Sequence, residues 1–355
     1  MQPQEFREAL ADPRAPERLS TAADVPLIVV PVVDAAGAQH LARLDVTSLP
    51  CVVLLQVRDP EVIRDPNLLS VADVVLTDDD TAPRPFTTPE DGVEAGLERI
   101  GAVVHRHPVA ATALALLLRS SSTLSVPAAL VAESSTYSAL QAGAEFIRWR
   151  ATRPPKPADP AELNAERVGL ELSGTLLRIT LTRPDRRNAL DAAMRDALTE
   201  ALALAAGDHS LNVQLNALGP DFCAGGDLDE FGSRPDPAIA HLTRLSRSPA
   251  RLMHALADRT VVRVHGACLG AGIELPAFAR TVIASPDARF GLPEIALGLI
   301  PGAGGTVSLP RRIGRRRTAY LALSGQPISA PQALGWGLID GIQVDDILAD
   351  DIQAG

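Results

Sequence analysis

Two glutamates stand in surroundings where a charged side chain needs a purpose. Glu274 follows a glycine-rich segment, residues 265–272, and its neighbours along the predicted helix are apolar. Glu294 lies in a Gly-Leu-Pro-Glu segment that continues into apolar and glycine-rich sequence. A carboxylate in an apolar setting is costly unless it has a partner or a function. Two such groups beside one polarised oxygen can hold a water molecule and move a proton.

Two loops rich in small residues could supply the polarising groups. One spans residues 221–229 directly after a predicted strand, and the other spans residues 265–274 between a strand and a helix. Small residues let the backbone approach a ligand closely. The N–H groups of residues 270–272 begin a helix, where they have no acceptor within the helix and lie at its positive end. They are candidate donors to an oxygen that becomes negative, although each loop alone is better explained as a tight turn.

The elements that must position these loops alternate between strands and helices. A hairpin is predicted over residues 168–181, with its turn at Ser173-Gly174. The other elements predicted in this half are strands at 211–218, 260–264 and 281–284 and helices at 191–206, 237–257 and 271–280. This alternation predicts a layered α/β domain with parallel strand pairing.

The preceding half of the chain, residues 1–151, is predicted to be an α/β module of unknown function that packs on the second domain. Its predicted strands are 27–33, 51–57 and 73–77, and its predicted helices are 92–104, 110–119 and 126–150. Four prolines between residues 152 and 160 cannot continue a helix, so residues 152–163 are predicted to be an extended linker to the second domain, residues 164–355.

No side chain of the first half suggests a specific reaction. His105 and His107 flank Arg106, and we interpret them as a polar helix end because no third metal ligand is in place. Glu133, Ser134 and Ser135 are expected on an ordinary helix surface. The three cysteines of the chain have no metal-ligand spacing, so we expect neither a zinc site nor a disulfide framework.

Composition limits the classes of partner. The net charge of −10 argues against a general nucleic-acid-binding surface, although a local basic pocket for one anionic ligand remains compatible with it. The N-terminus has no apolar signal core, and the longest apolar run, residues 108–118, is too short to span a bilayer. We therefore expect a cytoplasmic protein without a membrane partner.

Six stretches together resemble the crotonase superfamily, which contains the enoyl-CoA hydratases and isomerases. They are residues 183–190, 222–228, 265–274 and 290–306, followed by the pair 315–322 and 333–340. Their order and spacing also fit, and the resemblance covers about residues 166–342. It implies a spiral of ββα units that binds acyl-CoA thioesters.

The resemblance also implies roles for individual residues. The backbone N–H groups of Gly226 and Ala271 match the pair that holds the enolate oxygen in this family. The residues that match the substrate-binding segment around this pair are Ala224, Asp227 and Leu228. The residues that match the segment near the adenine and phosphates of coenzyme A are Arg183, Arg186, Arg187 and Ala189.

Hydratases of the family carry two glutamates, which correspond to Glu274 and Glu294. The resemblance therefore implies addition of water to a 2-enoyl-CoA, without a metal or a redox cofactor. Coenzyme A would be part of the substrate. The alternatives are an enoyl-CoA isomerase, another enolate reaction such as that of the cofactor-free dioxygenases, and a non-catalytic acyl-CoA-binding subunit.

Two departures from the family pattern concern architecture. Pro276 removes an N–H group close behind Glu274, so that helix is expected to be distorted. The chain ends soon after residue 340, where typical members continue with a helical segment that covers coenzyme A and builds trimers. Helices of residues 1–150 could replace that segment. A homotrimer or a dimer of trimers is expected.

Overall fold

The computed structural model describes residues 1–63, 65–153, 165–233 and 236–343 of the 355-residue chain. The predicted proline-rich linker falls mostly on residues outside these ranges. The described parts form a mixed α/β fold, which confirms the predicted fold class.

The main sheet of the C-terminal half has six strands in the order β12-β9-β7-β6-β5-β4. All neighbouring pairs are parallel except the hairpin β4–β5. The bounds are β4 Val168–Ser173, β5 Leu176–Leu181, β6 Asn212–Ala217, β7 Thr260–Val264, β9 Thr281–Ala284 and β12 Gly341–Ile342. Ser173 pairs with Leu176, so the predicted hairpin is confirmed with its turn one residue later.

A second, three-stranded sheet includes part of the predicted loop 265–274 as its strand β8, and Cys223 of the other loop pairs with Cys268 of that strand in an isolated bridge. Its order is β11-β10-β8, with β8 at Ala267–Leu269, β10 at Arg289–Gly291 and β11 at Ile328–Ser329. The helices around the two sheets are α9 Ala192–Gly207, α13 Gly305–Ile313, α14 Arg315–Ser324 and α15 Ala330–Trp336. Asp191 begins α9, because its side chain accepts the N–H of Met194 at 2.7 Å.

Two predicted helices of this half are shorter than expected. The predicted helix 237–257 is two helices, α10 Pro237–Ser246 and α11 Pro249–Ala255, because Pro249 begins the second helix and Ser248 caps it. The predicted helix 271–280 is α12 Ala271–Glu274 followed by a single 3-10 turn, Pro276–Phe278. Pro276 lacks the N–H that would continue α12, so the expected distortion is present.

The N-terminal half has a parallel sheet β1-β2-β3 with β1 Leu27–Val32, β2 Val52–Val57 and β3 Val74–Leu76. The helices before and between its strands are α1 Pro3–Leu10, α2 Ala15–Arg18 and α3 Ala35–Gln39. The helices after the sheet are α4 Val93–Arg106, α5 Pro108–Ser120, α6 Val126–Gln141 and α7 Ala144–Thr152. The predicted helix 126–150 is thus divided at Gly143, where an extended backbone begins α7.

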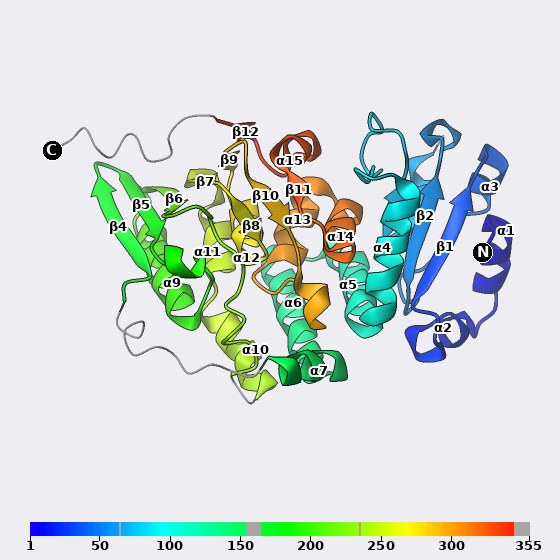
Figure 1. The fold of residues 1–355 in the computed structure, drawn as a ribbon, viewed down its shortest axis with the longest axis horizontal. Helices are drawn as coiled ribbons and strands as arrows, with labels where there is room; N and C mark the ends of the chain where they lie inside the picture. The colour runs from blue at the N-terminus through cyan, green and yellow to red at the C-terminus, as the bar shows by residue number, and fades with distance from the viewer. Residues whose placement is uncertain (64, 154–164, 234–235, 344–355) are drawn as a thin grey trace.

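The halves share a hydrophobic core. One cluster of buried side chains runs from β2 and β3 through α4–α7 into the sheets of the C-terminal half. A smaller cluster around Phe6 and Leu41 lies on the other face of the N-terminal sheet. In Figure 1, α5 and α6 lie beside α13 and α14, whereas α1–α3 lie at the far end of the molecule. Four N-terminal helices therefore form part of the C-terminal fold.

Among the described residues, no single helix has the length and apolarity to cross a membrane. The pair Val93–Arg106 and Pro108–Thr123 passes this test only when taken together, and it bends by 108° at the break between its members.

Candidate active site

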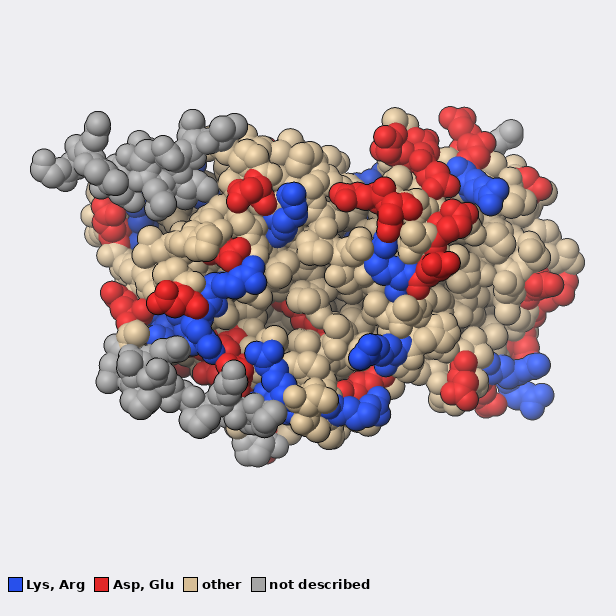
Figure 2. Space-filling model, viewed as in Figure 1, with Lys and Arg blue, Asp and Glu red and all other residues tan. Residues whose placement is uncertain are grey.

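A cavity of about 240 Å³ opens between the two halves of the chain. Five segments supply its wall: α6, residues 190–195, residues 226–233, residues 240–250 and residues 271–304. The predicted site residues in this wall are Gly226, Asp227, Ala271, Glu274 and Glu294. Figure 2 shows the hollow near the middle of this face, with basic side chains gathered around it despite the net charge of −10.

The two glycine-rich loops are joined through their backbones. Cys223 donates to the carbonyl of Ala267 at 3.0 Å, and Leu269 donates to the carbonyl of Cys223 at 3.0 Å. This close approach requires glycine at position 272, where a Cβ would lie 2.3 Å from the Cys223 carbonyl oxygen. The loops are thereby placed side by side at the cavity.

The predicted pair of N–H donors lies on these loops. On either side of Gly226, Leu190 donates to Gly225 at 2.8 Å and Asp227 donates to Leu190 at 3.0 Å. The N–H of Gly226 points the opposite way, because alternate N–H groups of an extended segment face opposite sides. Ala271 is the first residue of α12. Neither N–H has an acceptor among the described residues, so both remain available to a ligand oxygen in the cavity.

Glu274 is held by the beginning of α13. It is 2% exposed, and its Oε2 accepts the N–H groups of Ala303 and Gly305, both at 2.8 Å. Its other carboxylate oxygen accepts no hydrogen bond from the described residues, which leaves it available to a water molecule. Burial raises the pKa of Glu274 well above its ordinary value, and the charges of Glu294 and Glu133 raise it further.

Glu294 has a different environment. It is 7% exposed, and its Oε2 is buried without a hydrogen-bond partner among the described residues. Its Oε1 lies over Gly270, where a Cβ would come within 2.3 Å of that oxygen. Burial raises the pKa of Glu294 to about 8, and the charge of Glu133 adds to the shift. Near neutral pH this side chain is therefore mainly the protonated acid.

A third carboxylate, Glu133 of α6, lies in the same cavity. The prediction that Glu133 is on an ordinary helix surface is wrong, because its side chain is 2% exposed. Glu133 accepts the N–H of Gly304 at 2.8 Å, and it accepts the N–H and the hydroxyl of Thr306 at 2.9 and 2.7 Å. Burial raises the pKa of Glu133 to about 7.

The pattern that pointed to Glu274, a carboxylate among apolar residues of a predicted helix, is also present at Glu133. Leu130 and Tyr137, three residues before and four residues after it, lie on the same helix face, and both line the cavity. Ser134 was likewise misassigned: it is buried and lines the cavity, whereas Ser135 is exposed as predicted. Arg244 of α10 also lines the cavity and was not singled out from the sequence.

The other residues of the predicted substrate-binding segment, Ala224, Asp227 and Leu228, bond neighbouring parts of the protein and thereby hold the loop 221–229 in place. Ala224 donates its N–H to the Arg187 carbonyl at 2.9 Å, and the carbonyl of Leu228 accepts from Arg150 at 3.1 Å. Neither residue lines the cavity. Asp227 borders the cavity, but its carboxylate bonds Arg183 at 2.7 Å.

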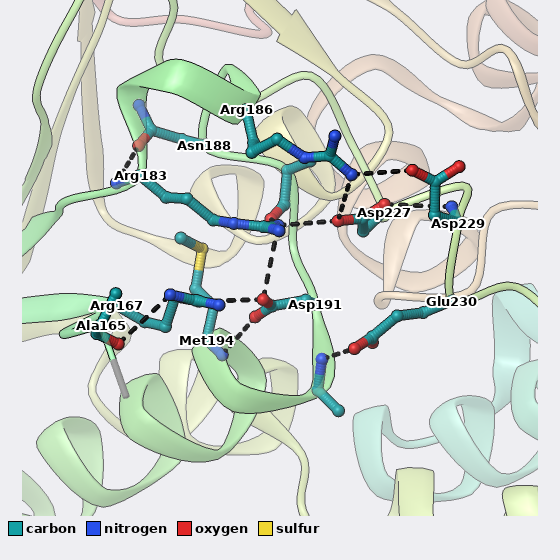
Figure 3. Close-up of polar contacts among 12 residues, drawn as sticks. Ala165, Arg167, Arg183, Arg186, Asn188, Asp191, Met194, Asp227, Asp229 and Glu230 are labelled. Atoms are coloured by element: carbon teal, nitrogen blue, oxygen red, sulfur yellow. Dashed lines mark hydrogen bonds and ion pairs between the residues drawn. The ribbon is translucent and has the colours of Figure 1, made fainter. Parts of the chain in front are cut away.

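The predicted coenzyme A residues lie outside the cavity wall. Figure 3 shows Arg183 between Asp227 and Asp191, and Arg186 pointing toward Asp229. Arg183 is buried in these ion pairs, whereas Arg186 is partly exposed and Arg187 is exposed. The carbonyl of Ala189 accepts from Arg183 at 3.2 Å. Contact between these four residues and coenzyme A stays a prediction.

Arg187 also has an acidic partner, since its Nε lies 2.6 Å from an oxygen of Asp221. The arginines of this loop are thus matched by nearby aspartates, and the loop keeps its shape through them. Arg187 and Asn188 adopt the left-handed conformation, with φ of 53° and 51°. The side chain of Asn188 bonds three backbone groups, including the Arg183 N–H at 2.8 Å, which compensates the strained turn.

Known proteins share this half of the chain. The sequence model of the enoyl-CoA hydratase/isomerase family matches residues 171–353. The 2,3-dehydroadipyl-CoA hydratase of Escherichia coli (strain K12) is 40% identical over 173 residues, which are 48% of this chain and 67% of that protein. The 1,2-epoxyphenylacetyl-CoA isomerase of the same strain is 36% identical over 184 residues, which are 50% and 70% of the two chains.

A solved structure is similar over the same region. The enoyl-CoA hydratase of Mycobacterium smegmatis is 32% identical, with a TM-score of 0.48 over 54% of this chain and 75% of that chain. The family match covers more than half of the present sequence, and it includes both glycine-rich loops and both predicted glutamates. The chain therefore belongs to the enoyl-CoA hydratase/isomerase family of the crotonase superfamily.

Proposed function

We propose that this protein is a hydro-lyase that adds water across the double bond of a 2-enoyl-CoA thioester. The observation that carries the proposal is the joint placement of Glu274, Glu294 and the N–H groups of Gly226 and Ala271 in the wall of one cavity. A relative named as a hydratase, the 2,3-dehydroadipyl-CoA hydratase, supports it.

The first part of the reaction is polarisation of the thioester. Its carbonyl oxygen accepts the N–H groups of Gly226 and Ala271, which draws electrons away from C3 of the acyl chain. Negative charge on this oxygen grows as the enolate forms, so the two donors stabilise the transition state more than the bound substrate. One such donor is typically worth ~2.7–4 kcal/mol in other enzymes.

Proton transfer is divided between the two glutamates. Glu274 acts as the base in this proposal: the N–H groups of Ala303 and Gly305 bond its Oε2 and oppose the effect of burial on its pKa, and it takes a proton from the water that attacks C3. Glu294, whose unpartnered oxygen favours the acid, gives its proton to C2 of the enolate. A proton then passes from Glu274 to Glu294 and restores both groups. The reaction moves only protons and water, so the proposal includes no metal or redox cofactor.

The test is replacement of each carboxylate by its amide. Glu274→Gln and Glu294→Gln should each lower kcat by ~10²–10⁴-fold and change KM little, because each removes a proton-transfer group and keeps its size. The double variant should lose less than the product of the single losses. Hydration is followed by loss of enoyl-thioester absorbance, and folding is checked by thermal melting. Glu98→Gln, at an exposed position of α4, is the matched control.

Two results would contradict the proposed hydratase function. Turnover like that of the parent chain in either well-folded variant would refute the two-glutamate hydratase. Migration of the double bond without water addition would make the protein an enoyl-CoA isomerase, the other activity in the name of the matched family.

We also propose that the protein is a homo-oligomer, a trimer or a dimer of trimers. Large apolar side chains are exposed in pairs on β4, at Leu170 and Leu172, and on α10, at Ile239 and Leu242. Exposed apolar surface of this kind is often covered by another subunit. Sedimentation equilibrium that shows only a 37.3 kDa species at all concentrations would reject the proposal.

A further inference from the structure

The cavity continues past the carboxylates to a polar end formed by α6 and α10. Tyr137 joins the two regions, because its ring lies against Gly302, where a Cβ would come within 2.4 Å of the ring. The next residue, Ala303, donates to Glu274. The guanidinium of Arg244 lies 4.7 Å from the centre of the Tyr137 ring. Tyr137 therefore has the carboxylate region on one side and Arg244 on the other, within the wall of one cavity.

Arg244 is surrounded by neutral acceptors. It donates to the hydroxyl of Ser134 at 3.1 Å, to the carbonyl of Ser134 at 3.4 Å, to Oε1 of Gln141 at 3.3 Å and to the hydroxyl of Ser138. Within the part of the chain that the structure describes, no carboxylate oxygen lies within 4.0 Å of this guanidinium. Two of its bonds are long, and charge-assisted bonds to a carboxylate are shorter and stronger. An incoming carboxylate can replace them.

The other arginines of the cavity wall differ from Arg244 in this respect. Arg195 lies 2.8 Å from an oxygen of Asp196, and Arg247 forms an ion pair with Glu200. Their charges are compensated by the protein. Arg244 is thus, among the described residues, the cavity guanidinium without a direct ion pair, and the Glu133 carboxylate acts on its charge only from beyond 4.0 Å.

We propose that this end of the cavity binds acyl chains that carry a carboxylate at their far end, with Arg244 as its binding partner. The substrate class is then the 2-enoyl-CoA thioesters of dicarboxylic acids. This inference rests on the proposed function for the reaction, but binding of the distal carboxylate requires no turnover. The loop expected to hold the coenzyme A phosphates, residues 183–189, is bonded to Ala224 behind Gly226. That loop lies outside the cavity wall, whereas Arg244 lines the cavity. The proposed site for the distal carboxylate is therefore separate from the predicted site for the coenzyme A phosphates.

Binding of saturated thioesters tests the proposal without catalysis. Succinyl-, glutaryl- and adipyl-CoA are titrated calorimetrically into the full-length protein, each beside the acyl-CoA of equal chain length that ends in a methyl group. At one chain length, the carboxylated ligand should bind at least tenfold more tightly. Arg244→Gln should lower the affinity for that ligand about 10- to 100-fold, as expected for a lost charged hydrogen bond. It should change the affinity for the neutral ligand less than about threefold.

Two further variants sharpen the comparison. Arg244→Lys keeps the charge and should recover part of the preference for the carboxylated ligand. Arg251→Gln removes an exposed arginine of α11 outside the cavity wall, and it should change neither affinity. The same ligands are also tested as N-acetylcysteamine thioesters, which lack the phosphates of coenzyme A, and the preference should persist.

Three outcomes would overturn the proposal. The first is the absence of any carboxylate preference in the parent chain. The second is equal loss of both ligands in Arg244→Gln, which would make Arg244 only a structural link between α6 and α10. The third is a loss of affinity in Arg244→Gln that is equal for both coenzyme A ligands and disappears with the N-acetylcysteamine thioesters, which would assign Arg244 to the phosphates. A preference that is present without hydration of any enoyl-CoA supports this site and contradicts the proposed function instead.

Discussion

Glu133 and Glu274 share the first turn of α13. The N–H groups of Ala303 and Gly305 go to Glu274, and those of Gly304 and Thr306 go to Glu133. The N-terminal end of a helix favours negative charge, so two carboxylates can be held there at once. The position of the Glu274 carboxylate therefore depends on a side chain from the other half of the chain.

Replacement of Glu133 should affect both stability and catalysis. In Glu133→Gln, an NH₂ group faces one of the N–H donors of α13, which should lower the free energy of unfolding by ~1–3 kcal/mol. Displacement of the turn should also lower kcat. Glu145 is the matched control, because it is equally a buried cap, accepting the N–H groups of Val109 and Ala110, but does not line the cavity.

Melting and steady-state hydration distinguish the two sites. Glu145→Gln should lower the melting temperature and leave kcat unchanged, whereas Glu133→Gln should lower both. Equal kcat values in the two variants would show that Glu133 only stabilises the fold.

The raised pKa of Glu294 makes stability depend on pH. Burial raises this pKa from 4.5 to about 8, so between these values the folded protein keeps a proton that the unfolded chain has released. The free energy of unfolding contributed by this group therefore falls as pH rises through this window. Glu294→Gln cannot titrate. The difference in melting temperature between Glu294→Gln and the parent chain, measured by calorimetry, should therefore shift in favour of the variant by several °C between pH 5 and pH 8.5. For the control Glu98→Gln this difference should not change with pH.

At the scale of the elements, the segment β8–α12 packs closely against the loop before Gly226, and this contact limits which residue can occupy position 272. A Cβ at position 272 would lie 2.3 Å from the Cys223 carbonyl oxygen, so Gly272→Ala must push the two loops apart. We expect a loss of ~1–3 kcal/mol in the free energy of unfolding and a lower kcat, because the Ala271 N–H moves with the loop.

Gly335→Ala provides the control for Gly272→Ala. Gly335 is exposed in α15, and a Cβ there would meet no atom within 4 Å. This substitution should stabilise the protein by ~0.4–1 kcal/mol, since it reduces the freedom of the unfolded chain. Denaturant unfolding and hydration assays of both variants check the pair. An unchanged stability in Gly272→Ala would contradict the close approach of the loops.

At the scale of the molecule, the two halves cannot be separated without exposing a core. Leu114 of α5 and Ala129 of α6 are fully buried in the cluster that continues into α13 and α14. Removal of residues 1–160 should therefore give an insoluble or wrongly assembled protein. Co-expression of residues 1–153 with residues 165–355 should restore solubility, because the lost contacts re-form between chains. A soluble, fully active chain without residues 1–160 would show that α4–α7 are dispensable.

The sequence by itself identified the parts of the site that lie within short segments. Gly226, Ala271, Glu274 and Glu294 occur in loops whose residue types are set by close backbone approach, and such local requirements leave a readable pattern. The strands and most helices were predictable for the same reason, since periodicity and turn residues act over a few positions. Proline explains where the predicted helices 237–257 and 271–280 end early, whereas the predicted helix 126–150 is divided at Gly143.

Only the tertiary structure decided which helix completes the cavity. Glu133 bonds Gly304 across 171 positions of sequence, and Arg244 meets Ser134 across 110. Helical periodicity shows that α6 has a buried face, but many helices could cover the same apolar surface, because the hydrophobic effect is not directional. The choice of α6, and with it the third carboxylate and the polar end of the cavity, depends on the fit of side chains in the assembled core.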